Sequence, residues 1–431
     1  MNSQYPRLLI INGTAIGDGS GTGVTLGNLF SNWPTKNILQ LCFSNGNSFD
    51  ASGSTYIPFP PQTAYIDNIV RKVFAGTNLS HRFNQGVQGM NAGIALPTLK
   101  SALHDCVRAL LDDSPIQMPG PIMKLVDEYQ PNVIYSNLAG LRILKSVLFF
   151  AKHYKIKIVA HFMDDWPSTI YTTSVLSQWA NKTVDRQIRH CLSHSECSLG
   201  ISEYMAEEYA KRFGVQFTWA CNPIEVPGQV CLLTDEHQLT FTYIGGLHLN
   251  RWKSLEIIAE ALEGFNQQGY QTFLDIYTKE EDRLAFQPQM KALSVINWKG
   301  HVSAERVPAI LQASNVLVHA ESFDANIIDF TRYSFSTKLS EYLASGRPIV
   351  AYAPRDIAST RYIEKYGGGL VADTPQTLYE QLQRLLMDAK LRRQLGSRGL
   401  ELARIHHQKD VVQQRVLDAI QSNLGQASLV K

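Results

Sequence analysis

One lysine in this sequence stands where the backbone of a helix disfavours positive charge. The stretch Ser336–Pro348 begins with a good N-cap, carries leucines at helical spacing, and ends with a glycine and a proline that stop a helix. Lys338 therefore falls in the first turn, where a cation is disfavoured by about 0.3–1 kcal/mol unless an anion lies beside it. A surface pair with Glu341 would contribute only about a few tenths of a kcal/mol and would leave this placement unexplained. The position of Lys338 therefore indicates a bound anion.

Two glycine-containing loops follow predicted strands and could approach the same anion. After Leu8–Asn12 the chain has glycines at 17, 19, 21 and 23, and a helix is expected to begin near Gly21–Val24. The loop lacks the lysine of a P-loop, and its spacing is loose for a dinucleotide fingerprint. A flexible surface turn explains these glycines equally well.

The second loop starts at Gly245 and Gly246, after the predicted strand 239–244, and leads through Arg251 into a helix over 255–262. Arg251 could chelate phosphate oxygens through two parallel hydrogen bonds. The alternative, a solvated residue at a helix start, is weaker because the helix dipole disfavours a cation there too.

Composition limits the classes of function. A chain of 431 residues with 44% hydrophobic content can bury two cores, and its 40 basic and 38 acidic residues argue against nucleic acid as the main partner. No segment reads as a signal peptide or reaches membrane-spanning length, so we expect a cytoplasmic protein. The six cysteines form no C-x-x-C pair, as expected of reduced thiols.

One segment, His190–Cys197, contains two histidines and two cysteines. Structural zinc sites usually draw paired ligands from two separated segments, whereas these lie at one junction of a helix and a strand. Helix-end histidines and core cysteines are the preferred interpretation, and no metal site is predicted.

Apolar runs of strand composition alternate with amphipathic stretches, which is typical of α/β domains built on doubly wound parallel sheets. Helices are predicted at 141–154, 203–213, 305–313 and 337–344. The clearest strands are predicted at 8–12, 38–43, 133–136, 156–162, 197–202, 239–244, 272–277, 296–299, 316–320 and 349–353.

Two domains, 1–223 and 224–431, are predicted from the prolines and glycine of Asn222–Gly228. Residues 44–100 are expected to form loops with one or two helices, which could shape an acceptor site or be an insertion without chemistry. The final amphipathic stretch, about 400–424, is long enough to return to the first domain.

Several of these blocks together resemble a known family. Gly245-Gly246-x4-Arg251, Trp298–Ser303 and Ser336–Val350 resemble the donor domain of a GT-B glycosyltransferase, and more narrowly the retaining family 4, the glycosyl transferases group 1. Gly200–Met205 followed by Asn222–Ile224 is similar to the end of that family's acceptor domain. The resemblance implies two Rossmann-like domains facing across a cleft, the first binding the acceptor and the second the nucleotide sugar.

The resemblance also implies roles for single residues. The anion would be the diphosphate of a sugar nucleotide, held by the helix N-terminus and the two loops, with the predicted set Ser336, Thr337, Lys338, Arg251, Gly21 and Gly23. Glu341 would accept hydrogen bonds from the ribose. The rest of the nucleotide would be contacted by Gly245, His301 and Val302.

Catalytic roles are implied for residues that follow two strands. His161 would hydrogen-bond the sugar or the acceptor, and Asp164 or Asp165 would orient the acceptor hydroxyl or act as its base. Capping of the next helix is the alternative for the aspartates. Glu321 is expected to face the sugar, with a solvated loop carboxylate as its alternative.

The sequence departs from the family at two positions. Tyr333 stands where many members carry a glutamate, and Gly246 stands where many carry an arginine. One usual phosphate cation is therefore missing or supplied from elsewhere. Arg347 is expected at the surface.

The expected function is a retaining glycosyltransferase that moves a sugar from a nucleoside-diphosphate sugar to a saccharide or lipid-linked saccharide acceptor, in polysaccharide or glycoconjugate biosynthesis. Neither a metal nor another cofactor is expected to be needed, because cations and helix N-termini stabilise the leaving diphosphate. The alternatives are a GT-B epimerase or hydrolase, or a non-catalytic binding subunit. Basic residues in Lys145–Lys157 could bring the protein to the inner face of a membrane, although such charges more often mark a solvated helix.

Overall fold

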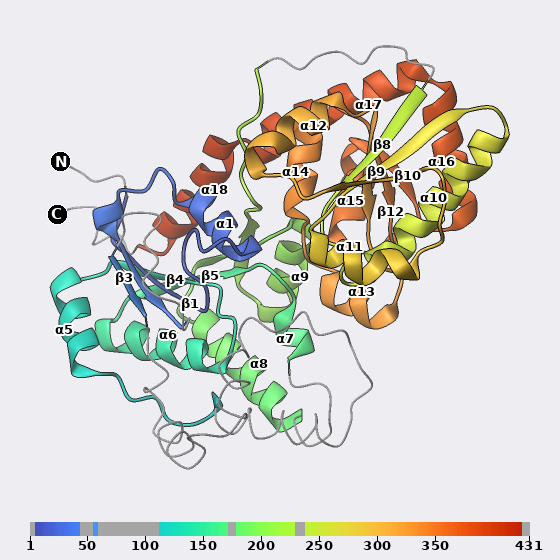
Figure 1. The fold of residues 1–431 in the computed structure, drawn as a ribbon. Helices are drawn as coiled ribbons and strands as arrows, with labels where there is room; N and C mark the ends of the chain where they lie inside the picture. Colours follow the sequence, from blue (N-terminus) through green and yellow to red (C-terminus); the bar gives the residue numbers. More distant parts are fainter. Residues whose placement is uncertain (1–4, 44–54, 59–111, 171–177, 229–237, 425–431) are drawn as a thin grey trace. The chain divides into compact units, whose positions relative to one another are not determined.

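The computed structural model describes residues 5–43, 55–58, 112–170, 178–228 and 238–424 (Figure 1). The chain divides into two units, Met1–Asn222 with Val412–Lys431, and Pro223–Val411. The loops and helices expected at 44–100 lie outside the described residues, apart from one strand, β3 (Thr55–Pro58).

The first unit is built on a parallel sheet of seven strands in the order β3-β2-β1-β4-β5-β6-β7. All five residues of β1 are buried, as expected of a central strand that is covered on both faces. Besides β3, the strands are β1 (Leu8–Asn12), β2 (Ile38–Cys42), β4 (Val133–Ser136), β5 (Lys157–Phe162), β6 (Cys197–Gly200) and β7 (Gln216–Trp219).

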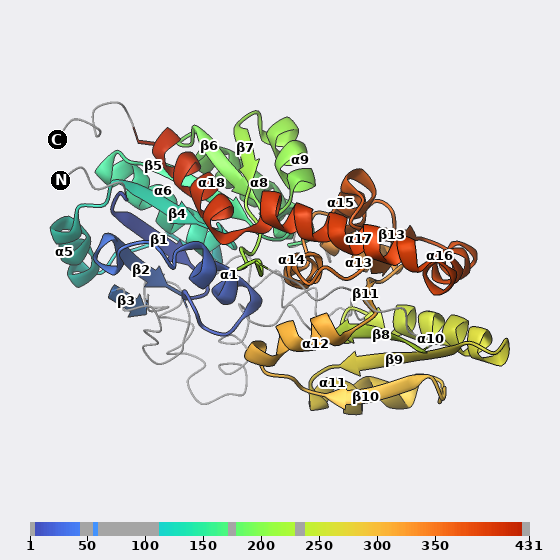
Figure 2. The same ribbon diagram turned by 90° about the horizontal axis from the view of Figure 1, so that it is seen from above.

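Helices cover both faces of this sheet. Leucines of α1 (Gly21–Leu29) and valines of α18 (Lys409–Ser422) share a core with β1 and β4, and Figure 2 shows α18 lying along the sheet. The opposite face is covered by α6 (Leu141–Tyr154) and α8 (Gln178–Leu192). The remaining helices are α5 (Gly120–Tyr129), α7 (Trp166–Thr169) and α9 (Glu203–Phe213).

The second unit is built on a parallel sheet of six strands in the order β10-β9-β8-β11-β12-β13. The central pair β8 and β9 is in register from Gln238↔Gln271 to Ile244↔Tyr277. The strands are β8 (Gln238–Ile244), β9 (Gln271–Tyr277), β10 (Ile296–Gly300), β11 (Val316–Ala320), β12 (Ile349–Tyr352) and β13 (Gly369–Ala372).

The helices of this unit also lie on both faces of its sheet. Leucines of α10 (Arg251–Gln267) and α16 (Pro375–Met387) pack on one face. The others are α11 (Glu280–Phe286), α12 (Val307–Ala313), α13 (Ala325–Thr331), α14 (Thr337–Ala344), α15 (Ala358–Tyr366) and α17 (Ala389–Leu402). The two parallel sheets with flanking helices confirm the predicted α/β class.

The stretch predicted as one final helix is interrupted. A π-helical turn, Ala403–His407, separates α17 from α18. The buried ring of His407 lies 3.1 Å from the hydroxyl of Ser340 and 2.9 Å from that of Tyr362. These contacts hold the interruption against α14 and α15.

Strand order reverses between β1 and β4 in the first sheet and between β8 and β11 in the second. Ligands of open parallel sheets bind beyond the carboxyl ends of the strands at such a reversal. In the second unit, Gly245 follows β8 and Glu321 follows β11. This edge is where the candidate site lies.

Candidate functional site

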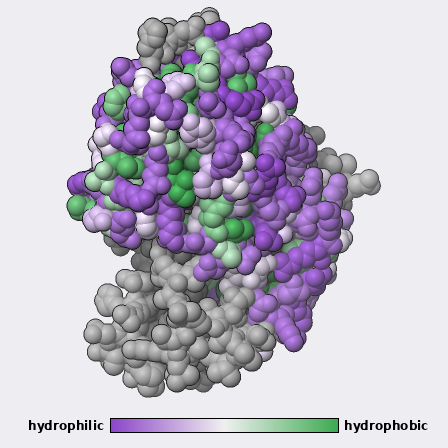
Figure 3. Space-filling view, turned by 90° about the vertical axis from the view of Figure 1, so that its right-hand side faces the viewer, coloured by the Kyte–Doolittle hydropathy of each residue, from purple (hydrophilic) through white to green (hydrophobic). Residues whose placement is uncertain are grey.

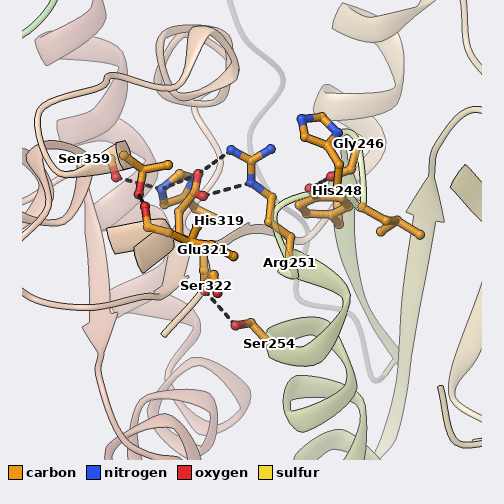
Figure 4. Close-up of polar contacts among 12 residues, drawn as sticks. Gly246, His248, Arg251, Ser254, His319, Glu321, Ser322 and Ser359 are labelled. Atoms are coloured by element: carbon orange, nitrogen blue, oxygen red, sulfur yellow. Dashed lines mark hydrogen bonds and ion pairs between the residues drawn. The ribbon is translucent and has the colours of Figure 1, made fainter. Parts of the chain in front are cut away.

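A two-point ion pair marks the carboxyl edge of the second sheet (Figure 4). Arg251, the first residue of α10, donates from Nε and Nη2 to the two carboxylate oxygens of Glu321, at 2.8 and 3.2 Å. The side chains are only 20% and 9% exposed. Burial lowers the pKa of Arg251, but the charge and hydrogen bond of Glu321, together with Tyr243 and Asp282, outweigh burial and raise that pKa. The third guanidinium nitrogen, Nη1, has no partner among the described residues.

Further contacts hold Glu321 in place. Ser254 donates to its backbone carbonyl at 2.6 Å. The buried ring of His319, bonded to Ser359 at 2.9 Å, lies 4.0 Å from its carboxylate. Burial lowers the pKa of His319, so the ring is neutral near pH 7. The carboxylate of Glu321 therefore orients Arg251, and its expected contact with the sugar stays a prediction.

The loop between β8 and α10 has a fixed backbone. The hydroxyl of Tyr243 donates to the carbonyl of Gly246 at 2.7 Å, and the N–H of Leu247 donates to Asp282 at 2.8 Å. Leu249 and Asn250 follow with φ of 57° and 56°, a left-handed backbone conformation that residues other than glycine rarely adopt. Gly245, which donates its N–H to Tyr277 in β9 at 3.0 Å, is part of the same edge.

Lys338 lies at the second position of α14, as predicted. Ser336 is the N-cap but makes no side-chain capping bond, and the first turn, which starts at Thr337, contains no acidic residue. Lys338 takes part in none of the ion pairs found among the described residues. Burial raises the pKa of the partly buried Glu341, and the charge of Lys338 partly offsets this. The helix start therefore carries a positive charge without a counter-ion in the described chain.

His301 and Val302 follow β10 at the same carboxyl edge. The exposed His301 comes directly after Gly300, which has φ of 74° and accepts a hydrogen bond from the N–H of Thr278 at 3.1 Å. Their predicted contact with the nucleotide stays a prediction. Tyr333, between α13 and α14, is half-buried.

His161 in the first unit does not face solvent. Its ring is fully buried, accepting from the hydroxyl of Tyr135 at 2.5 Å and donating to the carbonyl of Ala220 at 3.0 Å. Burial lowers the pKa of His161 to about 4. Because both ring nitrogens are bonded within the protein, the expected contact with sugar or acceptor is corrected to a structural role.

The two aspartates after β5 differ. Asp165 is buried, accepts from the hydroxyl of Tyr209 at 2.5 Å and lies 3.9 Å from Arg212. It occupies the N-cap position of α7 without a capping bond. Asp164 is half-buried. Asp165 is therefore placed in a structural network, whereas the predicted role of Asp164 stays a prediction.

Contacts within the chain explain why position 23 in α1 is a glycine. A Cβ at Gly23 would lie 2.0 Å from Oδ1 of Asp18, and the N–H of Gly23 already donates to Ser20 at 3.0 Å. Asp18 accepts from both the N–H and the hydroxyl of Ser20. An anionic side chain therefore already occupies this helix start, which corrects the diphosphate role of Gly23. Gly21 is exposed, with open space around it.

Several charges expected at the surface are paired or buried. Lys145 pairs with Asp113 at 2.6 Å and Lys157 with Glu196 at 2.8 Å, which weakens the case for a membrane-binding region. Arg347 is 5% exposed and donates to the carbonyl of Gln312, so its predicted surface position was wrong.

Neither a membrane span nor a metal cluster is found in the part of the chain that the structure describes. No helix there is long and apolar enough to cross a bilayer, and no three metal-ligating side chains are grouped. On the face in Figure 3, hydrophobic residues form small areas within a mostly hydrophilic surface.

Sequence reasoning missed three members of this site: His248, His319 and Ser359. His319 is an isolated polar residue in an otherwise apolar strand, which signals a buried hydrogen bond but not its partner, Ser359, 40 positions away. His248 stood within the Gly245–Arg251 loop, but its type alone carried no signal.

Comparisons with known proteins agree with the α/β fold of the two units. Residues 232–401 match the family described as glycosyl transferases group 1. HepE from Anabaena, solved in complex with UDP, is 12% identical, with 96% of this chain and 100% of that chain covered and a TM-score of 0.66.

Two synthases are similar in fold as well. Sucrose-phosphate synthase from Thermosynechococcus elongatus is 13% identical, with 96% and 98% covered and a TM-score of 0.59. Trehalose 6-phosphate synthase from Burkholderia multivorans is 11% identical, with 99% and 98% covered and a TM-score of 0.59. No curated protein matches the sequence.

Proposed function

We propose that this protein is a glycosyltransferase whose donor is a nucleoside-diphosphate sugar bound at the start of α14, because residues 232–401 match the glycosyl transferases group 1 family and the chain has the GT-B fold. The acceptor is a hydroxyl of a saccharide or lipid-linked saccharide. We extend the proposal to transfer with retention, in polysaccharide or glycoconjugate biosynthesis. The buried thiols of Cys191 and Cys197 support action in the reducing cytoplasm.

The uncompensated charge of Lys338 carries this proposal. Lys390 takes the same second position in α17, but there the side chain of Asp388 caps the helix and accepts from Leu391. At α14 the cap makes no side-chain bond and the first turn has no acid. Free N–H groups beside a cation form a site for phosphate.

In this proposal, different residues contact different parts of the donor. Lys338 and the N–H groups of α14 stabilise charge on the departing diphosphate, and Nη1 of Arg251 is free to join them. Glu341, one turn beyond Lys338, is assigned the hydrogen bonds from the ribose hydroxyls in this proposal. Because these groups supply positive charge directly, we propose that transfer needs no metal ion or other cofactor.

UDP is the first nucleotide to test, since HepE was solved with UDP and with UDP-glucose. Melting temperatures are measured with a panel of nucleoside diphosphates and their sugars, for the wild type, Lys338→Ala and Lys390→Ala. A ligand that binds only the folded state raises the melting temperature, by RT ln(1 + [L]/Kd) in free energy. We expect one nucleotide to raise it for the wild type and Lys390→Ala but not for Lys338→Ala.

No shift with any nucleotide would remove the diphosphate from this proposal. An equal rise in melting temperature for Lys338→Ala would show that the diphosphate binds at a site that does not include Lys338. Once a nucleotide sugar binds, release of nucleoside diphosphate only with an acceptor separates transfer from hydrolysis or epimerisation. The anomeric configuration of the product, read by NMR, tests retention.

A further inference from the structure

The ring of His248 fills the space that Gly246 leaves open. A Cβ at position 246 would lie 2.4 Å from Nδ1 and 2.5 Å from Cε1 of His248. Figure 4 shows the ring beside Gly246 and near the guanidinium of Arg251. The side chain remains 44% exposed, so a ligand can reach it.

Charged groups from four segments act on this ring: Arg251 at the start of α10, Asp282 in α11, Glu321 after β11 and Lys338 in α14. Burial, Arg251 and Lys338 lower the pKa of His248, whereas Asp282 and Glu321 raise it; the net effect is a lowered pKa. The ring is therefore neutral near pH 7 in the ligand-free protein.

Neither ring nitrogen of His248 has a hydrogen-bond partner in the described part of the chain. The nearest carboxylate oxygen, on Asp282, lies 4.0 Å from Nδ1, beyond hydrogen-bonding distance, and accepts instead from the N–H of Leu247. An exposed imidazole that feels the charge of two cations and has both nitrogens unused is suited to bind an anion.

We propose that His248 is a proton-dependent ligand of the donor diphosphate, taking up a proton when the nucleotide sugar binds beside Lys338 and Arg251 and then donating a hydrogen bond to a phosphate oxygen. This rests on the proposed donor site. Negative charge bound beside these cations reverses the electrostatic balance at the ring and favours the imidazolium. The charged ring then forms a charge-assisted hydrogen bond and stabilises the departing diphosphate.

The sign of the pH dependence follows from this coupling. The pKa of His248 in the free protein lies below its ordinary value. The bound diphosphate raises this pKa in the complex. Affinity is therefore highest at low pH and falls as pH rises between the two values, by at most about tenfold per pH unit. Above the pKa of the complex, affinity is lower and constant.

Calorimetry with UDP-glucose in buffers of different ionisation enthalpy counts the protons taken up on binding. This ligand is suitable because its diphosphate does not ionise near neutral pH; if another nucleotide sugar of the panel binds instead, it takes the place of UDP-glucose. We expect net uptake for the wild type near pH 7. For His248→Gln, which cannot be protonated, we expect no uptake and weaker binding that does not change with pH.

His190→Gln is the matched control, because burial also lowers the pKa of His190, which lies in α8 of the first unit. It should keep the wild-type proton count. The melting temperature of each variant without ligand checks its fold.

Uptake that persists in His248→Gln would assign the proton to another group, such as Glu341, and overturn the inference. Binding without proton uptake by the wild type would overturn it as well, while leaving the proposed donor class intact. Failure of the wild type to bind any nucleotide sugar would overturn the donor class and the inference together.

Discussion

Arg251 and Glu321 form a two-point ion pair between the first turn of α10 and the end of β11, across 70 positions of the sequence. The pair uses Nε and Nη2 and leaves Nη1 free. Glu321 therefore sets the direction in which Arg251 presents its remaining donor.

Replacing Glu321 by glutamine should destabilise the ligand-free protein by about 1–3 kcal/mol, because a mostly buried guanidinium loses its charged partner. The double variant Arg251→Gln/Glu321→Gln should regain part of this loss, since no charge then remains unpaired. Thermal and denaturant unfolding of the wild type, both single variants and the double variant measure the coupling. Strictly additive losses would show that the two residues are not coupled.

Removing the charge of Lys338 should stabilise the protein when no ligand is present. Lys338→Gln is expected to raise the free energy of unfolding by about 0.3–1 kcal/mol, because it removes a cation from an uncapped helix start. Lys390→Gln should raise the free energy of unfolding by less, because the side chain of Asp388 already offsets the charge at that helix start. Melting temperatures without nucleotide test this, and a lower value for Lys338→Gln would mean that an unrecognised group in the chain balances the lysine.

His161 should make stability depend on pH. Its pKa in the folded protein is about 4, below the ordinary value of 6.5, so the unfolded chain binds more protons between these values. The contribution to stability is full above pH 6.5 and is lost as pH falls towards 4, by about 1.4 kcal/mol per unit. The difference in melting temperature between the wild type and His161→Gln should shrink as pH falls from 7 to about 5. A constant difference over this range would show that His161 does not titrate as its burial requires.

Alanine at Gly21 and alanine at Gly23, both in the first turn of α1, should have different effects. Gly23→Ala should destabilise by about 1–3 kcal/mol, because its Cβ would displace Asp18 from Ser20. Gly21→Ala meets open space and should be neutral or stabilising by up to about 1 kcal/mol. The melting temperatures of the two variants test this. If both change by the same amount, the packing of Asp18 against Gly23 is not the reason for a glycine at position 23.

The strands and helices were largely predictable from the sequence. The predicted bounds of β1, β4, β11, α6, α9 and α14 coincide with those observed. These elements depend on local signals, namely apolar periodicity, N-caps and stop residues, which act within a few positions of the chain. The place of Lys338 in the first turn of α14 follows from the same local signals.

Only the tertiary structure decided what the polar side chains do. Ligand contacts were predicted for Glu321, His161 and Gly23 from their positions after strands or in a glycine loop. In the structure each has a neighbour within the protein: Arg251 for Glu321, Tyr135 for His161 and Asp18 for Gly23. The role proposed for His248 depends on charges from four separate segments, which only the tertiary structure brings near its ring. Sequence determines which residues end a strand or start a helix, because those effects are local. Which side chains neutralise one another depends on strand order and packing, which bring distant segments to one edge of the sheet.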